Sequence, residues 1–307
     1  MVNSVNSNLT LEIDNTSISA HEQERARVTL LSPSERSDFV ESIVIPIPQF
    51  TQAIKMMDTL YDKHEQKEPG GLKIYGASGS GKSIIGKFFL QKHPPIFSEN
   101  AEIPVLHITL TSTINITELL PLFFKAIGYP FTITAGIHSQ IELLVTALKE
   151  RQVRLIIIDE AQELAERKAS TRTRRLSNIL KNIYTKSNIP QVYLGTNILK
   201  YLFEIGEQLA TRITTTHSIS SLSLNMDYIS MLNAFDDSLP MHSPCNLAKN
   251  YAENLLDASG GILRILRMIL SNAVRIAAED HSESITRKHF SNAYFEVLGS
   301  GENPFNV

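Results

Sequence analysis

Short apolar runs alternate with segments of helical periodicity through the middle of the chain. The runs GLKIYG (71–76) and VRLIIID (153–159) are apolar and too short for helices, whereas 50–64 spaces its apolar residues as a helix does. The predicted strands are 71–76, 104–110, 153–159, 190–196 and 215–224, and the helices between them are 82–93, 116–128, 137–152, 170–187 and about 198–210. Such alternation predicts an α/β fold, a parallel five-stranded sheet with helices on both faces.

The pattern changes on both sides of this region. Residues 1–38 are rich in Ser, Asn, Thr and Glu with little apolar periodicity, which predicts a loosely ordered extension with a short helix over 20–30. After about residue 224 the strand signals stop, and four helices are expected at 226–235, 246–259, 262–280 and 286–298. The expected domains are therefore the extension, an α/β core (39–224), a helical domain (225–298) and a tail (299–307).

Composition narrows the class of protein. Hydrophobic residues make up 42% of the 307 positions and charged residues 20%, as in globular chains. The single cysteine, Cys245, excludes an intrachain disulfide and a Cys-based zinc cluster, which favours a cytoplasmic location. The start does not resemble a signal peptide, and no apolar run reaches the roughly 18 residues of a membrane span. The net charge of −3 requires any nucleic-acid contact to come from a local patch.

The strongest motif is GASGSGKS at 76–83, which fits G-x-x-x-x-G-K-[ST] and lies between a predicted strand and a predicted helix. Glycine permits backbone conformations that point successive N–H groups at phosphate oxygens, and the helix start adds a positive dipole end. Lys82 would reach the β- and γ-phosphates, and the Ser83 hydroxyl would bind Mg²⁺. The candidate nucleotide-binding residues are Gly76, Ala77, Ser78, Gly79, Ser80, Gly81, Lys82 and Ser83. The alternative interpretation is an ordinary Gly/Ser-rich turn.

Polar residues also follow two other predicted strands. LIIIDE (155–160) ends in Asp159, which would hold Mg²⁺, and Glu160, which would polarise a water for attack on the γ-phosphate. QVYLGTN (191–197) ends in Thr196 and Asn197, either of which would contact the γ-phosphate or the attacking water. The alternatives are a solvated strand end for the first pair and a plain turn for the second.

Several cations are candidates for contacts with phosphate. Arg212 precedes the last predicted strand, and Arg264 follows Gly260-Gly261 in SGGILR. Between Arg167 and Lys186 there are seven Lys or Arg and no acidic residue, which indicates either contact with a nucleic-acid backbone or a solvated helix face.

This order of motifs resembles the AAA+ ATPases, and several stretches resemble the TnsC/TniB group of transposition regulators, relatives of phage MuB. The narrower likeness is carried by VIPIPQFTQAIKMMDTLYD, VLHITLTSTINITELLPLFFKAIGYPF, LIIIDEAQELAERKASTRTRRLSNILKNI, NIPQVYLGTNILKYLFEIGEQLATRI and ENPF. It implies an AAA+ core with a C-terminal helical lid. It also implies an ATPase using ATP and Mg²⁺ that self-associates into rings or filaments on double-stranded DNA and links a TniQ/TnsD-like target-selection factor to the transposase.

The resemblance assigns residue roles as well. Thr196 or Asn197 falls at the first sensor, Arg212 at an inter-subunit finger and Arg264 at the lid sensor. Two sets compete as DNA contacts, namely the pore-lining positions Thr132, Thr134, Lys149 and Arg151, and the basic helix positions Arg172, Arg174 and Arg175. The alternative functions are a helicase loader or replication initiator on the same core, and a signalling NTPase without a DNA role. The tail, GSGENPFNV, is either a frayed end or a peptide whose Phe305 docks on the transposase.

Overall fold

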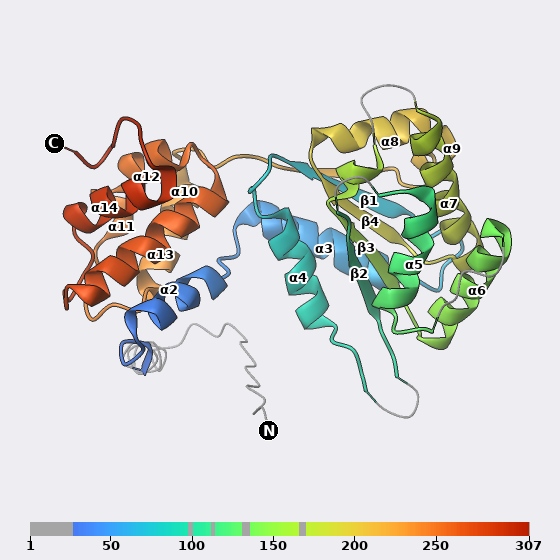
Figure 1. Cartoon of the computed structure of the whole chain (residues 1–307), viewed down its shortest axis with the longest axis horizontal. Coiled ribbons are helices and arrows are strands. Elements are labelled where there is room, and N and C mark those ends of the chain that lie inside the picture. The colour runs from blue at the N-terminus through green and yellow to red at the C-terminus, as the bar shows by residue number, and fades with distance from the viewer. Residues whose placement is uncertain (1–26, 98–100, 112–113, 131–135, 166–169, 307) are drawn as a thin grey trace. The chain divides into compact units, whose positions relative to one another are not determined.

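The computed structural model describes residues 27–97, 101–111, 114–130, 136–165 and 170–306 (Figure 1). The chain divides into two compact units. An α/β unit contains Pro46–Ser223 and Gly261–Arg264, and a helical unit contains the residues up to Ile45, Leu224–Gly260 and the residues from Ile265 onward. The DNA candidates Thr132 and Thr134 lie outside the described residues, as do residues 20–26 of the expected helix over 20–30.

The α/β unit is built around one five-stranded sheet with the order β2-β3-β4-β1-β5, all parallel. The strands are β1 (Gly71–Gly76), β2 (Val105–Thr109), β3 (Leu155–Asp159), β4 (Gln191–Gly195) and β5 (Thr215–Ile219). The helices are α3 (Pro48–Asp62), α4 (Lys82–Lys92), α5 (Ile116–Ala126), α6 (Ile137–Glu150), η1 (Ala161–Leu164), α7 (Thr171–Ser187), η2 (Asn197–Leu199), α8 (Lys200–Ile205) and α9 (Glu207–Ala210). The predicted parallel sheet is confirmed.

Helices cover both faces of this sheet, as the alternation of side chains along each strand allows. On one face Leu106, Ile156 and Tyr193 belong to a single core cluster with the apolar residues of α5, α6 and α7. On the other face α4 approaches so closely that a Cβ at Gly86 would lie 3.0 Å from the Leu194 side chain. Because both faces are covered, every residue of β3 and β4 is buried, which explains why both strands are apolar except for Asp159 at the end of β3 and Gln191 at the start of β4.

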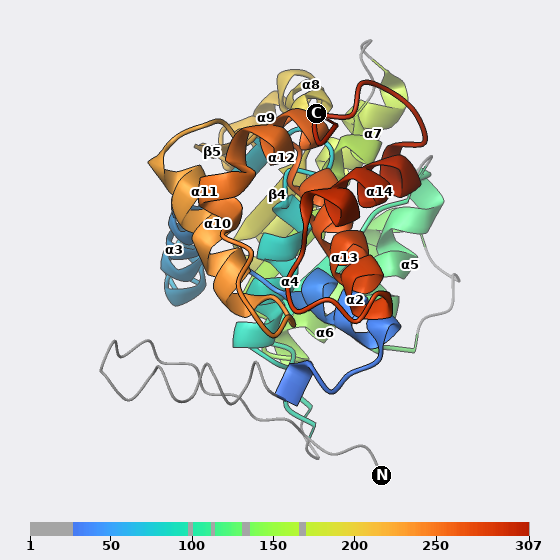
Figure 2. The ribbon, with the colours of Figure 1, turned by 90° about the vertical axis from the view of Figure 1, so that its left-hand side faces the viewer.

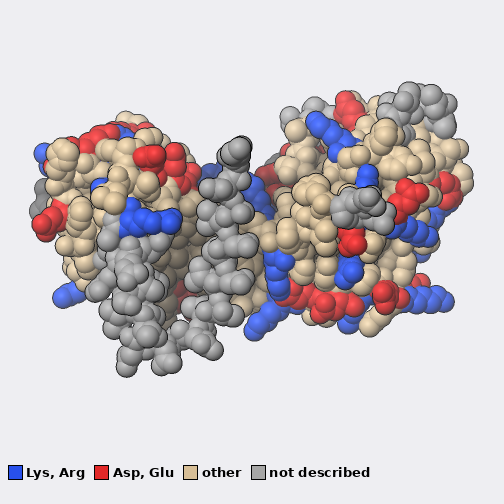
Figure 3. All heavy atoms as spheres, turned by 90° about the horizontal axis from the view of Figure 1, so that it is seen from below, with Lys and Arg blue, Asp and Glu red and all other residues tan. Residues whose placement is uncertain are grey.

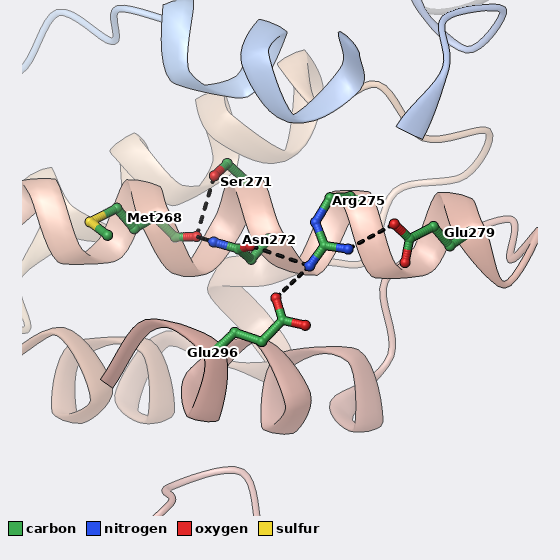
Figure 4. A network of polar contacts seen from close by, with 6 residues as sticks. All are labelled: Met268, Ser271, Asn272, Arg275, Glu279 and Glu296. Carbon is green, nitrogen blue, oxygen red and sulfur yellow. Dashed lines mark hydrogen bonds and ion pairs between the residues drawn. The ribbon is translucent and has the colours of Figure 1, made fainter. Parts of the chain in front are cut away.

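The helical unit consists of α2 (Pro33–Ser42), α10 (Met226–Ser238), α11 (Leu247–Asn250), α12 (Ala252–Ser259), most of α13 (Leu263–Glu279) and α14 (Arg287–Leu298) (Figure 2). Arg275 on α13 donates to Glu279, 2.7 Å away and one turn later, and to Glu296 on α14 (Figure 4). Ser271 on the same helix donates to Glu41 of α2 over 3.3 Å. Polar contacts therefore connect α13 to helices at both ends of the chain.

The N-terminal boundary differs from the sequence expectation. Helix α2 begins inside the segment expected to be a loose extension, and it belongs to the helical unit rather than to the α/β core. Ser32 and Glu35 form a capping box at its start, and Val40 is fully buried. The Ser-Pro-x-Glu signal was present in the sequence. The helix has little amphipathic character, so its burial depends on the partner helices.

The C-terminal tail also differs from its expectation. Phe305 is only 2% exposed and stacks on Phe290 of α14 at 5.2 Å between ring centroids. Asn303 donates to the Ser291 carbonyl over 3.1 Å, and Asn254 of α12 donates to the Pro304 carbonyl over 2.6 Å. Gly299 and Gly301 take positive φ values, 75° and 128°, which turn the chain back onto the helices. Phe305 is thus a core residue of the helical unit, and its docking on a transposase is not supported.

Candidate nucleotide site

The loop between β1 and α4 has the backbone that the P-loop motif predicts. Gly79 and Gly81 have φ values of 77° and 100°, which side-chain-bearing residues rarely adopt. A Cβ at Gly81 would lie 2.4 Å from the ring of Phe50, and one at Gly79 would lie 2.9 Å from the side chain of Ile262. Glycine is therefore required at both positions, for conformation and for space. Gly76 ends β1, Ala77, Ser78 and Ser80 complete the connection, and Ser83 is the second residue of α4.

Lys82 is the first residue of α4, and its side chain reaches back to the P-loop. The Lys82 ammonium donates to the carbonyls of Gly76 and Ala77 over 2.9 and 2.7 Å, and Lys82 is 7% exposed. Burial lowers the pKa of Lys82, whereas the carboxylates of Glu160 and Asp159 oppose that change. The cation and two carboxylates are therefore close together around the loop. The ammonium also lies 3.4 Å from the Ser80 hydroxyl, so its partners are neutral oxygens that it can exchange for the oxygens of a phosphate.

Asp159 ends β3 beside this loop and is 3% exposed. Burial alone would raise the pKa of its carboxyl, but contacts with His107, Ser83 and the Glu160 backbone outweigh burial and hold the pKa below its ordinary value. The carboxylate stays ionised beside the Ser83 hydroxyl, which is the oxygen pair that Mg²⁺ takes together with substrate phosphates. Among the residues that the structure describes, no group of three or more His, Cys, Asp or Glu is placed to hold a metal by itself.

Glu160 follows in an unusual backbone conformation. Its φ of 52° is left-handed, and its backbone N–H donates to Asp159 Oδ1 over 2.8 Å. This turn ends β3 and starts η1. The Glu160 side chain accepts a hydrogen bond from Gln162 Nε2. Both carboxylates are predicted from the sequence, whereas no local pattern singles out Gln162.

Thr196 and Asn197 follow β4 and differ in environment. Thr196 is partly buried, and its Oγ1 is buried with no hydrogen-bond partner among the described residues. Asn197 begins η2 and is exposed. Gly195 pairs with Tyr75, the residue before the P-loop, so both candidates lie at the carboxyl end of the sheet near Lys82. The unpartnered Thr196 hydroxyl favours it over Asn197 as the group that contacts substrate.

The two candidate arginines lie in different places. The Arg264 backbone N–H donates to the Gly79 carbonyl over 3.0 Å, and its side chain is exposed beside the P-loop. Arg212 donates to the Gln208 carbonyl over 2.8 Å and precedes Thr215, which pairs with Leu72 at the start of β1. Arg264 is therefore near the P-loop of its own chain, whereas Arg212 lies near the amino ends of β1 and β5, away from the strand ends that carry the P-loop.

The proposed DNA residues are spread over two edges of the α/β unit. Lys149 and Arg151 lie at the end of α6, before the start of β3. Arg172, Arg174 and Arg175 lie at the start of α7, after the carboxyl end of β3. The Arg172 guanidinium donates to the carbonyls of Ile114 and Glu163, so it connects two loops, whereas Arg174 and Arg175 are exposed. Basic and acidic side chains both occur on the α/β unit in the view of Figure 3.

His107 was not identified from the sequence either. Its Nε2 lies 3.9 Å from Asp159 Oδ2 and has no hydrogen-bond partner among the described residues. A single His within a strand carries no local signal for such a role. Only the pairing of β2 with β3, which aligns His107 with Ile157, brings it near Asp159.

Comparison with known proteins decides the family. A family model described as bacterial TniB protein matches residues 38–220, which is more than half of the chain. The chain belongs to the bacterial TniB family. The predicted TnsC/TniB-type relationship is confirmed, and the matched region contains the P-loop, Asp159, Glu160 and Arg212. No curated protein matches the chain.

Solved structures show the fold to which this TniB-family chain is similar. The ORC2 protein of Aeropyrum pernix, in ADPNP and ADP complexes, aligns with a TM-score of 0.63 and 16% identity over 86% of this chain and 72% of that one. Cdc6p of Pyrobaculum aerophilum aligns with a TM-score of 0.62 and 16% identity, over 86% of this chain and 72% of that one. The Aeropyrum pernix ORC1 protein in complex with DNA aligns with a TM-score of 0.53 and 15% identity, over 82% of this chain and 66% of that one. The fold is that of the P-loop AAA+ ATPases, as predicted.

In the described part of the chain, no helix has the length and apolar character needed to span a membrane.

Proposed function

We propose that this chain is an ATP-dependent, sequence-nonspecific DNA-binding regulator of DNA transposition. ATP-bound subunits assemble as a ring or filament on target duplex and connect a TniQ/TnsD-like target-selection factor to the transposase. The observation that carries this proposal is the TniB family match over the unit that contains the nucleotide site. The DNA complex of a protein with a similar fold supports the choice of DNA as a ligand.

Within this function, the site hydrolyses ATP. Lys82 and the P-loop N–H groups hold the phosphates, while Ser83 and Asp159 hold Mg²⁺, which neutralises charge on the transferred group when bound. Glu160 accepts a proton from the attacking water, and Thr196 contacts the γ-phosphate or that water. Arg264 contacts nucleotide in the same subunit. A replication initiator is the second candidate, because the ORC and Cdc6 structures share the fold, and a dependence of DNA insertion on this chain distinguishes the two functions.

DNA binding is expected to require ATP and to weaken steeply with salt. A chain with a net charge of −3 gathers enough positive charge only when subunits line up along the duplex. Each neutralised phosphate adds about −0.9 to the slope of log K against log salt, measured by fluorescence anisotropy on unrelated duplexes. The Lys82→Ala variant is the control without nucleotide, and tight sequence-independent binding by it would contradict the assembly model.

Two double alanine variants test which edge of the α/β unit contacts DNA. Lys149→Ala with Arg151→Ala tests one edge of the α/β unit, and Arg174→Ala with Arg175→Ala tests the other. Arg172 is left unchanged because its guanidinium supports two loops. The pair that flattens the salt slope by about two phosphates identifies the contact surface. An unchanged slope in both double variants would exclude both surfaces.

Arg212 is expected to complete the ATP site of an adjacent subunit. It lies near the amino ends of β1 and β5, whereas Lys82 follows the carboxyl end of β1, so we expect it to act on the nucleotide of a neighbouring subunit and not on its own. Arg212→Ala alone and Lys82→Ala alone should both lose ATPase activity. Mixing them should restore part of it, because some interfaces then combine an intact P-loop with an intact arginine. Lys181→Ala, which removes a cation 3.2 Å from Gln208 on the same surface, is the matched control. Failure to regain activity at every mixing ratio would exclude action between subunits.

A further inference from the structure

Gln162 connects the two polar strand ends of the nucleotide site. Its Nε2 donates to the Glu160 carboxylate, and its Oε1 accepts the backbone N–H of Thr196 over 3.1 Å. Both halves of one side-chain amide are therefore used, one toward the residue after β3 and the other toward the residue after β4. No role for Gln162 follows from the P-loop or from the Asp159-Glu160 pair alone.

The backbone around Gln162 favours this double contact. Glu160 has a left-handed backbone with φ 52° and ψ 36°, and η1 begins directly after it. The Glu163 N–H donates to the Glu160 carbonyl over 3.0 Å, and the Ala165 N–H donates to the Gln162 carbonyl over 2.9 Å. This short turn folds Gln162 back toward the side chain two residues earlier.

Gly195 provides the space on the other side. A Cβ at this position would lie 2.9 Å from Gln162 Oε1 and 3.2 Å from the Gln162 backbone nitrogen. Any side chain there would displace the amide. Gly195 is not in a left-handed conformation, so the close approach of Gln162, together with that of the Leu199 side chain at 3.1 Å, accounts for glycine at the end of β4.

The chemistry of the contact indicates its effect. An amide N–H holds one carboxylate oxygen of Glu160, which fixes the side-chain rotamer and leaves the second oxygen available to accept a proton from water. The same amide is held by the Thr196 N–H, and Thr196 follows Gly195, which pairs with Tyr75 before the P-loop. The orientation of the base is thereby tied to the strand end that contacts the γ-phosphate.

We infer that Gln162 is a positioning residue that orients Glu160 for water activation and couples its orientation to Thr196 at the end of β4. The inference rests on the proposed ATP hydrolysis at this site. Gln162 acts through Glu160 and does not itself exchange a proton with substrate. Its loss should therefore affect the catalytic step and leave nucleotide affinity unchanged.

Two substitutions separate the halves of the amide. Gln162→Ala removes both contacts, whereas Gln162→Glu keeps an acceptor for the Thr196 N–H but has no donor for Glu160. Both variants are expected to lower kcat for ATP by about 10- to 100-fold with KM unchanged. Gln152→Ala is the matched control, because the Gln152 amide makes the same kind of bond to Glu102, over 2.9 Å, away from the nucleotide site.

A measurement on the nucleotide-free protein tests the contact itself. Hydrogen exchange of the Thr196 amide, followed by NMR, should accelerate in Gln162→Ala and stay slow in Gln162→Glu. In a Glu160→Gln background, Gln162→Ala should cause no further loss of single-turnover rate, because its effect passes through the Glu160 carboxylate.

The outcomes distinguish this inference from the proposed function. An inactive wild-type protein would refute ATP hydrolysis, and the exchange result would still report on the Gln162–Thr196 bond. An active wild type with an unchanged kcat in Gln162→Ala would refute the positioning role alone. An equal loss of rate in both backgrounds, or a raised KM, would show that Gln162 supports the fold of the site and not the orientation of Glu160.

Discussion

Replacing Glu160 with glutamine is expected to lower kcat for ATP by a factor of about 100 or more while ATP still binds. The amide keeps the shape of the carboxylate but cannot accept the proton of the attacking water. Lys82 and the P-loop are unchanged, so nucleotide affinity measured by calorimetry should match that of the wild type. Phosphate release measured over a range of ATP concentrations gives kcat and KM separately.

Two further variants serve as controls for the loss of hydrolysis in Glu160→Gln. Glu163→Gln makes the same chemical change at a neighbouring carboxylate in η1, and this variant should retain the wild-type rate. Lys82→Ala should instead lose ATP binding, because the ammonium that replaces its carbonyl partners with phosphate oxygens is gone. Hydrolysis by Glu160→Gln at the wild-type rate would show that another group activates the water.

Phe305→Ala is expected to destabilise the protein by about 3 to 5 kcal/mol, the usual cost of truncating a buried Phe. The ring is 2% exposed and stacks on Phe290, so its removal leaves a cavity between the tail and α14. Urea unfolding followed by far-UV circular dichroism gives the change in free energy of unfolding. A free peptide at this position would produce no change.

Phe295→Ala is the matched control, since Phe295 lies on α14 itself but is 44% exposed. Its loss should cost less than about 1 kcal/mol. Equal effects of the two substitutions would contradict the packed position of the tail.

The nucleotide-binding half of the site could be predicted from sequence because its chemistry is local. The positions of Gly79 and Gly81 before Lys82 specify both a backbone conformation and a charge, and the apolar run before Asp159 specifies a buried parallel strand. Contacts between distant segments carry no such local signal. The 3.9 Å approach of His107 to Asp159 and the bond from Thr196 to Gln162 both depend on which strands are neighbours.

The ends of the chain show the same division. The tail, with its flexible Gly-Ser-Gly start and no periodicity, has the sequence of an unattached peptide, yet Phe305 finds an aromatic partner 15 residues earlier on Phe290. Helix α2 has a clear capping box, but its membership in the helical unit depends on contacts such as the 3.3 Å bond between Glu41 and Ser271, which are 230 residues apart.

The sequence by itself determined the strand–helix alternation, the P-loop and the acidic strand end, because backbone conformation, burial and charge are specified there by neighbouring residues. Only the tertiary structure decided that Gln162 bridges Glu160 and Thr196, that Arg172 holds two loops and that Phe305 is buried. In each of these cases the partner is brought near by the order of strands or by helix packing. Short-range patterns in a sequence do not encode those distances.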